Sequence, residues 1–162
     1  MSTTFEDTQS ALTADQGALT VKLLTLLLAD EYLLYTKTRN YHWNIRGPRF
    51  NDLHKFFESQ YELLDEKIDE IAEFIRYFDH PAPASLGTFL KNTRLKEDLS
   101  PIASSEEMVK ALLADHESLI AYLRADIATI ETSDGPVEVA DLLTGLLADH
   151  GKMAWMLRAT SV

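Results

Sequence analysis

Five side chains of the types that bind metal ions lie between residues 42 and 73 of this 162-residue chain: His42, His54, Glu58, Asp69 and Glu73. Imidazole nitrogens and carboxylate oxygens together suit iron(II), and also zinc, cobalt or manganese. Such a small set of ligands, with the carboxylates shared, leaves room at the metal for an oxidant. The five residues therefore indicate a metal site that could carry out redox chemistry.

The spacing of the ligands argues against one site within one subunit. His54 and Glu58 are four residues apart, as are Asp69 and Glu73, so each pair shares one face of a helix. The two pairs are separated by fifteen residues, or roughly 22 Å along a helix. If two copies of this helix pack antiparallel about a two-fold axis near residues 61–65, His54 and Glu58 of one subunit face the two acids of the other. Isologous symmetry then produces two identical sites per dimer.

His42 joins this arrangement through a turn. His42 and His54 lie six residues on either side of Pro48, and the sequence Arg46-Gly47-Pro48 breaks a helical pattern. A helical hairpin at this point places the two histidines opposite each other. No Glu-x-x-His motif occurs anywhere in the chain, which excludes the internal di-iron site that depends on two such motifs.

The elements that must position these residues follow from apolar spacing and helix-breaking residues. Apolar residues recur with helical periodicity in four long segments, and two prolines and a polar linker separate the second from the third. A short helix fits within this connection. We expect long helices over about 16–44, 50–78, 105–131 and 137–158, and the short one over 85–90.

Short first and third connections with one long middle crossover are typical of an all-α, ferritin-like four-helix bundle with a short extra helix in the crossover. Periodicity alone would also permit other four-helix topologies. Residues 1–15 are polar and lack a sustained period, so we expect an acidic flexible tail followed by one domain over 16–162.

Composition indicates the cellular compartment and the classes of binding partner. The net charge is −11 with no cysteine, which favours a reducing compartment and a surface that repels nucleic acid and anionic membranes but attracts cations. Neither a signal peptide nor an apolar run long enough to span a membrane is apparent. The expected location is the cytoplasm.

Several motifs resemble one known family. These are N-Y-H-W-N at 40–44, R-G-P-x-F at 46–50, L-H-x-x-F-E at 53–58 and D-E-I-A-E at 69–73, with further likeness at 86–98, 140–144 and 155–158. Together they make the chain similar to the Dps family of mini-ferritins, named for DNA-binding proteins from starved cells. The likeness covers nearly everything beyond the tail.

The resemblance implies a function and an assembly. It implies a hollow dodecamer in which ferroxidase sites at dimer interfaces oxidise iron(II), preferably with hydrogen peroxide, and store ferric mineral, which limits oxidative stress from hydroxyl radicals. The five residues above would be the iron ligands or their close supports. By the same resemblance, Trp43 would lie beside the site as an electron donor, and Asp141 would line a three-fold pore through which iron enters.

One feature departs from the DNA-binding members of that family, whose affinity for DNA comes from tails rich in lysine and arginine. Here the first basic residue is Lys22, while Glu6, Asp7 and Asp15 make the tail acidic. We therefore predict little DNA binding at physiological salt. The alternatives are a nucleoid-compacting protein and a purely structural bundle whose histidines and acids are incidental.

The remaining polar residues have simpler interpretations. His80, His116 and His150 have acidic residues only as immediate neighbours, so we interpret them as structural or surface groups. The second helix also carries Glu62, Asp65, Glu66 and Glu70, which form either a solvated face or, in a cage, a lining that nucleates mineral.

Overall fold

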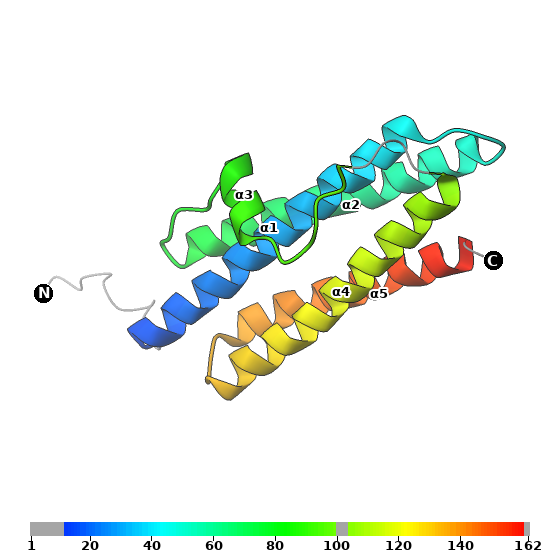
Figure 1. Cartoon of the computed structure of the whole chain (residues 1–162). Coiled ribbons are helices and arrows are strands. Elements are labelled where there is room, and N and C mark those ends of the chain that lie inside the picture. The colour runs from blue at the N-terminus through cyan, green and yellow to red at the C-terminus, as the bar shows by residue number, and fades with distance from the viewer. Residues whose placement is uncertain (1–11, 100–103, 161–162) are drawn as a thin grey trace, which may run out of the picture.

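The computed structural model describes residues 12–99 and 104–160, and all regular structure in that part of the chain is helical. Four long helices form two hairpins, and a short helix lies in the connection between the hairpins (Figure 1). The helices are α1 (Ala14–Asn44), α2 (Phe50–Tyr77), α3 (Leu86–Asn92), α4 (Ser105–Thr132) and α5 (Val137–Thr160). The predicted four-helix bundle with an extra helix in the crossover is confirmed.

Two capping boxes set the starts of α1 and α4. The Thr13 side chain accepts from the Gln16 backbone while the Gln16 side chain accepts from the Thr13 backbone, and Ser104 and Glu107 repeat this reciprocal pairing. These pairs satisfy backbone N–H groups that a helix N-terminus leaves unpaired. The first cap explains why α1 begins at Ala14, two residues before the predicted start. Most of the predicted tail, residues 1–11, lies outside the described residues.

The hairpin of α1 and α2 turns at Gly47, whose φ of +103° lies in the left-handed region that glycine adopts without strain. The apolar stripes of the four long helices meet in one core dominated by leucine. Its fully buried side chains include Leu24, Leu27, Leu28, Leu34, Leu53, Phe57, Leu64, Ile71, Ile75, Met108, Leu112 and Leu119.

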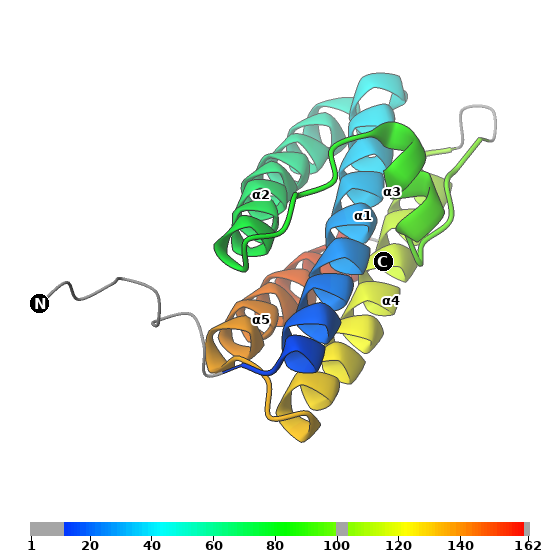
Figure 2. The same ribbon diagram turned by 90° about the vertical axis from the view of Figure 1, so that its left-hand side faces the viewer.

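The crossover is fastened to the bundle by buried ion pairs. Arg94 binds Asp30 of α1 at 2.7 Å and Asp126 of α4 at 2.9 Å, so it bridges the two hairpins. Figure 2 shows the crossover, with α3, passing along α1 toward α4. Burial raises the pKa of Asp30, and Arg94 opposes that rise through its charge and its hydrogen bonds. In the described part of the chain, no helix is long and apolar enough to cross a membrane.

Candidate functional site

The two histidines on either side of the first turn are brought into direct contact. His42 lies in the last turn of α1 and His54 in the second turn of α2. Their rings stack with centroids 3.8 Å apart and planes 19° apart. The expectation that the hairpin places them opposite each other is confirmed.

Each histidine is anchored by the backbone of the other. His42 Nδ1 lies 2.7 Å from the carbonyl oxygen of His54, and His54 Nδ1 lies 2.9 Å from the carbonyl oxygen of His42. A carbonyl oxygen can only accept a hydrogen bond, so both Nδ1 atoms carry the proton and donate. In its neutral form each ring then keeps its lone pair on Nε2, the atom that binds a metal ion. The two rings are thus held in the tautomer of metal ligands.

The three carboxylates extend along the same side of α2. Since a helix turns about 100° per residue, His54, Glu58, Asp69 and Glu73 lie within a sector about 100° wide, away from the core. Glu58 is half-buried, whereas Asp69 and Glu73 are exposed. Among the described residues of this single chain, no three His, Cys, Asp or Glu side chains are grouped to hold a metal ion. The two histidines and the two distant acids are not brought together within one chain.

Aromatic side chains and an arginine surround the histidine pair. The Tyr61 ring meets the His42 ring edge-on at 5.2 Å, and its hydroxyl donates a long hydrogen bond of 3.4 Å to Glu58. The Arg39 guanidinium lies 4.6 Å from the Tyr61 ring centre and 5.4 Å from that of Trp43. Trp43 itself is 68% exposed. The family resemblance pointed to Trp43, and sequence reasoning missed Tyr61, although Tyr61 follows Glu58 by three residues and so shares its helix face.

Comparison with known proteins decides the family. The ferritin-like domain model matches residues 21–161. The DNA protection during starvation protein 2 of Bacillus anthracis is 34% identical over 139 residues, which span 86% of this chain and 94% of that protein. The chain belongs to the Dps branch of the ferritin-like family.

Further comparisons agree in sequence and in shape. A low temperature-induced protein of Nostoc sp. is 41% identical over 148 residues, 91% of this chain and 83% of that protein. The crystal structure of the Dps protein from Vibrio cholerae O1, described as a member of the ferritin-like diiron-carboxylate superfamily, superposes with a TM-score of 0.86 at 30% identity, covering 98% of each chain. Membership supports an iron-related role for the present chain.

A second histidine pair lies inside this Dps-type bundle. His116 of α4 and His150 of α5 are buried, with their Nδ1 atoms 2.9 Å apart, and His150 Nε2 lies 2.7 Å from Glu31 Oε1 of α1. Both histidines are structural, as interpreted, but the partner of His150 is 119 residues away in sequence. One signal was available: each of the three polar residues stands on an apolar stripe, as His116 does between Leu112 and Leu119.

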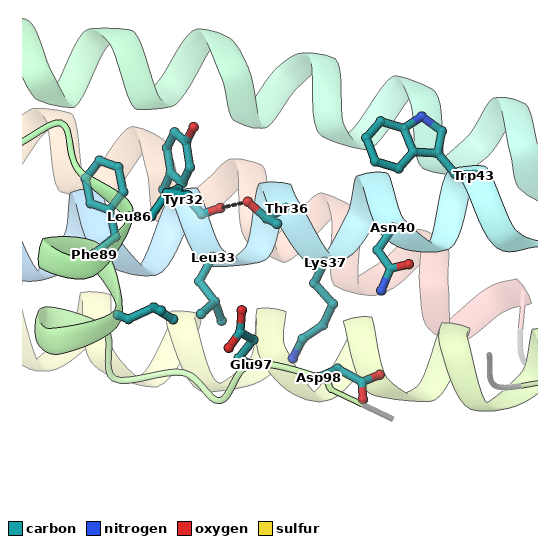
Figure 3. A pocket seen from close by; sticks show the side chains of 11 residues that line it. Tyr32, Leu33, Thr36, Lys37, Asn40, Trp43, Leu86, Phe89, Glu97 and Asp98 are labelled. Carbon is teal, nitrogen blue, oxygen red and sulfur yellow. Dashed lines mark hydrogen bonds between the residues drawn. The ribbon is translucent and has the colours of Figure 1, made fainter. Parts of the chain in front are cut away.

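Two further features lie outside the histidine site. Asp141 is exposed near the start of α5 and lines a hollow together with Glu70 and Glu138. A cleft of about 320 Å³ opens along α1 beside α3, and Trp43, Tyr32 and Phe89 are among its lining residues (Figure 3). Leu86 and Leu90 of α3, also in its lining, are 67% and 50% exposed.

Proposed function

We propose that this Dps-type protein oxidises iron(II), with hydrogen peroxide as the oxidant, at sites shared between two subunits, and stores the ferric product as mineral in a hollow dodecamer. Its work would be iron storage and the suppression of oxidative damage in the cytoplasm. Iron is the substrate and the cargo. The observation that carries the proposal is the stacked histidine pair, because its reciprocal anchoring leaves two Nε2 lone pairs free for a metal ion.

The other half of each site would come from a second copy. Asp69 and Glu73 are exposed on the histidine-bearing side of α2, and an antiparallel neighbour would bring them to the histidine pair. Trp43 of α1 and Leu86 and Leu90 of α3 are also exposed, and a subunit interface would bury them. In this arrangement His42, His54 and Glu58 come from one subunit, and Asp69 and Glu73 come from its partner.

The chemistry follows from the ligand set. Neutral imidazoles hold iron(II), while carboxylates favour the more highly charged iron(III), so mixed ligands lower the free-energy cost of oxidation. The acidic surface, with a net charge of −11, concentrates cations around the protein. Asp141, with its acidic neighbours Glu70 and Glu138, is the proposed entrance for iron at a pore between subunits.

A mixing experiment tests whether the sites are shared. His54→Ala and Asp69→Asn subunits are each expected to lack rapid iron(II) oxidation by peroxide, measured by stopped-flow absorbance. When the two variants are unfolded together and reassembled in equal amounts, one site in each mixed dimer regains both halves, which restores about a quarter of the wild-type activity by random pairing. His80→Ala, which changes an exposed histidine, serves as the matched control.

The outcomes separate the alternatives. No recovery on mixing would contradict a shared site, and full activity in both variants would contradict the proposed ligands altogether. A purely structural bundle predicts that neither substitution changes iron oxidation.

DNA protection is the second candidate, because relatives such as the Bacillus anthracis protein carry that name. We propose that DNA binding by this chain is negligible at physiological salt, since phosphate contacts need clustered positive charge and the first basic residue is Lys22. A gel-shift assay at low and at physiological salt tests this. Retained binding at the higher salt would contradict it.

A further inference from the structure

Two other aromatic rings contact the histidine pair, Phe50 against His54 at 5.0 Å and Tyr61 against His42 at 5.2 Å, and only the tyrosine has a phenolic proton to lose on oxidation. Its ring meets the ring of His42 at 5.2 Å in an edge-on geometry, which places it against a ligand from its own subunit. Trp43, which the family resemblance suggests as the electron donor, is 68% exposed, and no ring contact joins it to either histidine within the described residues. The ring contact with His42 therefore favours Tyr61 over Trp43 as the electron donor.

From these contacts we infer that Tyr61 is the residue that supplies an electron to peroxide when only one iron(II) occupies a site. The inference rests on the proposed function, and it names a further catalytic residue for the same site. It concerns a half-filled site, because a second iron(II) would otherwise provide the second electron that peroxide needs.

The surroundings of Tyr61 dictate how it is oxidised. The Arg39 guanidinium lies 4.6 Å from the ring centre, and a positive charge at that distance opposes the formation of a positively charged ring radical. Oxidation must therefore be accompanied by loss of the phenolic proton. The Glu58 carboxylate, 3.4 Å from the hydroxyl, is positioned to accept that proton. The product is a neutral tyrosyl radical.

The electrons and atoms balance. Iron(II) gives one electron and becomes iron(III), and the phenol of Tyr61 gives the second electron together with its proton. Peroxide takes up two electrons and two protons, one of which comes from solvent, and its O–O bond breaks to form two water molecules. A one-electron reduction of peroxide would instead release a hydroxyl radical. Tyr61 would therefore protect the protein cage from the hydroxyl radicals that half-filled sites would otherwise produce.

Two further tyrosine rings continue from Tyr61 and could carry the oxidised state onward. The Tyr35 ring lies 6.1 Å from that of Tyr61, and the Tyr32 ring lies 5.9 Å from that of Tyr35. Arg39 also donates a hydrogen bond to the Tyr35 hydroxyl, which ties the first two rings of this row together. The row of rings runs along α1 away from the histidine pair, so the oxidised state can move away from the iron.

The test uses the full assembled protein loaded with one iron(II) per site and then mixed with hydrogen peroxide. Freeze-quenched samples are examined by EPR, and the same samples are assayed for iron oxidation. Wild-type protein is expected to show a neutral tyrosyl radical, and ring-deuterated tyrosine should change its hyperfine pattern. Tyr61→Phe should lose the signal and should release hydroxyl radicals that a spin trap detects.

Tyr122→Phe is the matched control. Tyr122 also has an arginine 4.6 Å from its ring centre and also donates a 3.4 Å hydrogen bond, but these partners are Arg94 and the Arg94 carbonyl, on the crossover. The radical should persist in this variant and in Trp43→Phe. Glu58→Gln, which keeps the tyrosine but removes the proton acceptor, should lower the radical yield.

The possible failures differ from one another. If wild-type protein oxidises no iron, the proposed function fails and this inference fails with it. If iron is oxidised but no tyrosyl radical forms, or the radical persists in correctly assembled Tyr61→Phe, only the inference is overturned. If deuterated tryptophan changes the EPR spectrum and deuterated tyrosine does not, the electron donor is Trp43.

Discussion

Two pairs of histidines in this protein use the same side chain in opposite ways. In the outer pair, His42 and His54 donate from Nδ1 to backbone carbonyls and keep both Nε2 atoms available. In the inner pair, His116 and His150 are hydrogen-bonded to each other, and His150 Nε2 is bonded to Glu31. Backbone anchoring therefore prepares imidazoles for a ligand, whereas side-chain anchoring uses them to hold helices together.

The electrostatics of the inner pair follow from its bonds. Glu31 Oε1 accepts a hydrogen bond from His150 Nε2, and a second hydrogen bond joins His150 Nδ1 to His116 Nδ1. Among the described residues, His116 Nε2 has no hydrogen-bond partner. Burial, reinforced by the neighbouring His150, holds the pKa of His116 well below its usual value.

The largest expected effect comes from breaking the inner pair. His150→Ala leaves the Glu31 carboxylate fully buried without its partner, and such a loss costs about 3–5 kcal/mol of unfolding free energy. Chemical denaturation at fixed protein concentration measures it. His80→Ala, at an exposed position, should change stability by less than about 0.5 kcal/mol. Equal effects of the two substitutions would contradict the role given to the inner pair.

Breaking the outer pair should affect chemistry more than stability. His42→Gln removes one Nε2 ligand, and the rate of iron(II) oxidation by peroxide should fall at least about 100-fold, the upper range for the loss of a residue that merely supports a metal ligand. Stopped-flow absorbance measures the rate. His116→Leu provides the comparison, because the inner pair is not expected to bind iron. An unchanged rate in His42→Gln would exclude His42 as a ligand.

The inner pair should also make stability depend on pH. The folded-state pKa of His116 is depressed, so the unfolded chain binds a proton near pH 6.5 that the folded protein does not. The contribution of neutral His116 is complete above about pH 6.5 and decreases by about 1.4 kcal/mol per pH unit below it, until the folded pKa is reached. Denaturation between pH 7 and pH 5 should show this slope in wild-type protein and a smaller one in His116→Leu.

The smallest expected effect concerns Glu58, the carboxylate beside the outer pair. Glu58→Gln keeps the shape of the side chain but removes its charge, and we expect about a tenfold loss in the rate of iron oxidation with two iron ions per site. Stopped-flow absorbance at saturating iron(II) is the measurement. Glu117→Gln, at a surface acid paired with Arg158, should leave the rate unchanged. A loss as large as that of His42→Gln would make Glu58 a principal ligand.

The ends of the helices and the outer pair could be predicted because their causes are local. Ser104 with Glu107 is a capping box that spans three residues, and the turn at Gly47-Pro48 lies midway between the two histidines; the equally local cap of Thr13 with Gln16 went unrecognised, so α1 begins two residues before its predicted start. The inner pair could not be predicted in this way. Its bond to Glu31 joins residues 119 positions apart, and sequence spacing carries no information about which buried polar groups meet.

The aromatic residues around the outer pair also could not be predicted from sequence spacing. The family resemblance suggested Trp43, and because successive residues of a helix are about 100° apart, the Trp43 side chain leaves α1 in a different direction from that of His42. Tyr61 reaches the His42 ring from the opposite helix. Within the described part of one chain, the tyrosine ring that contacts His42 is therefore supplied by the other helix of the hairpin.

The sequence by itself determined the helices, the hairpin at residue 47 and the segregation of histidines from acids along one helix face, because these depend on periodicity, capping and breaking residues. Only the tertiary structure decided which histidine nitrogens stay free, which carboxylate lies beside His150 and which ring touches His42. Those outcomes depend on how distant side chains meet when the two hairpins pack, and hydrogen-bond partners and burial are defined only at that stage.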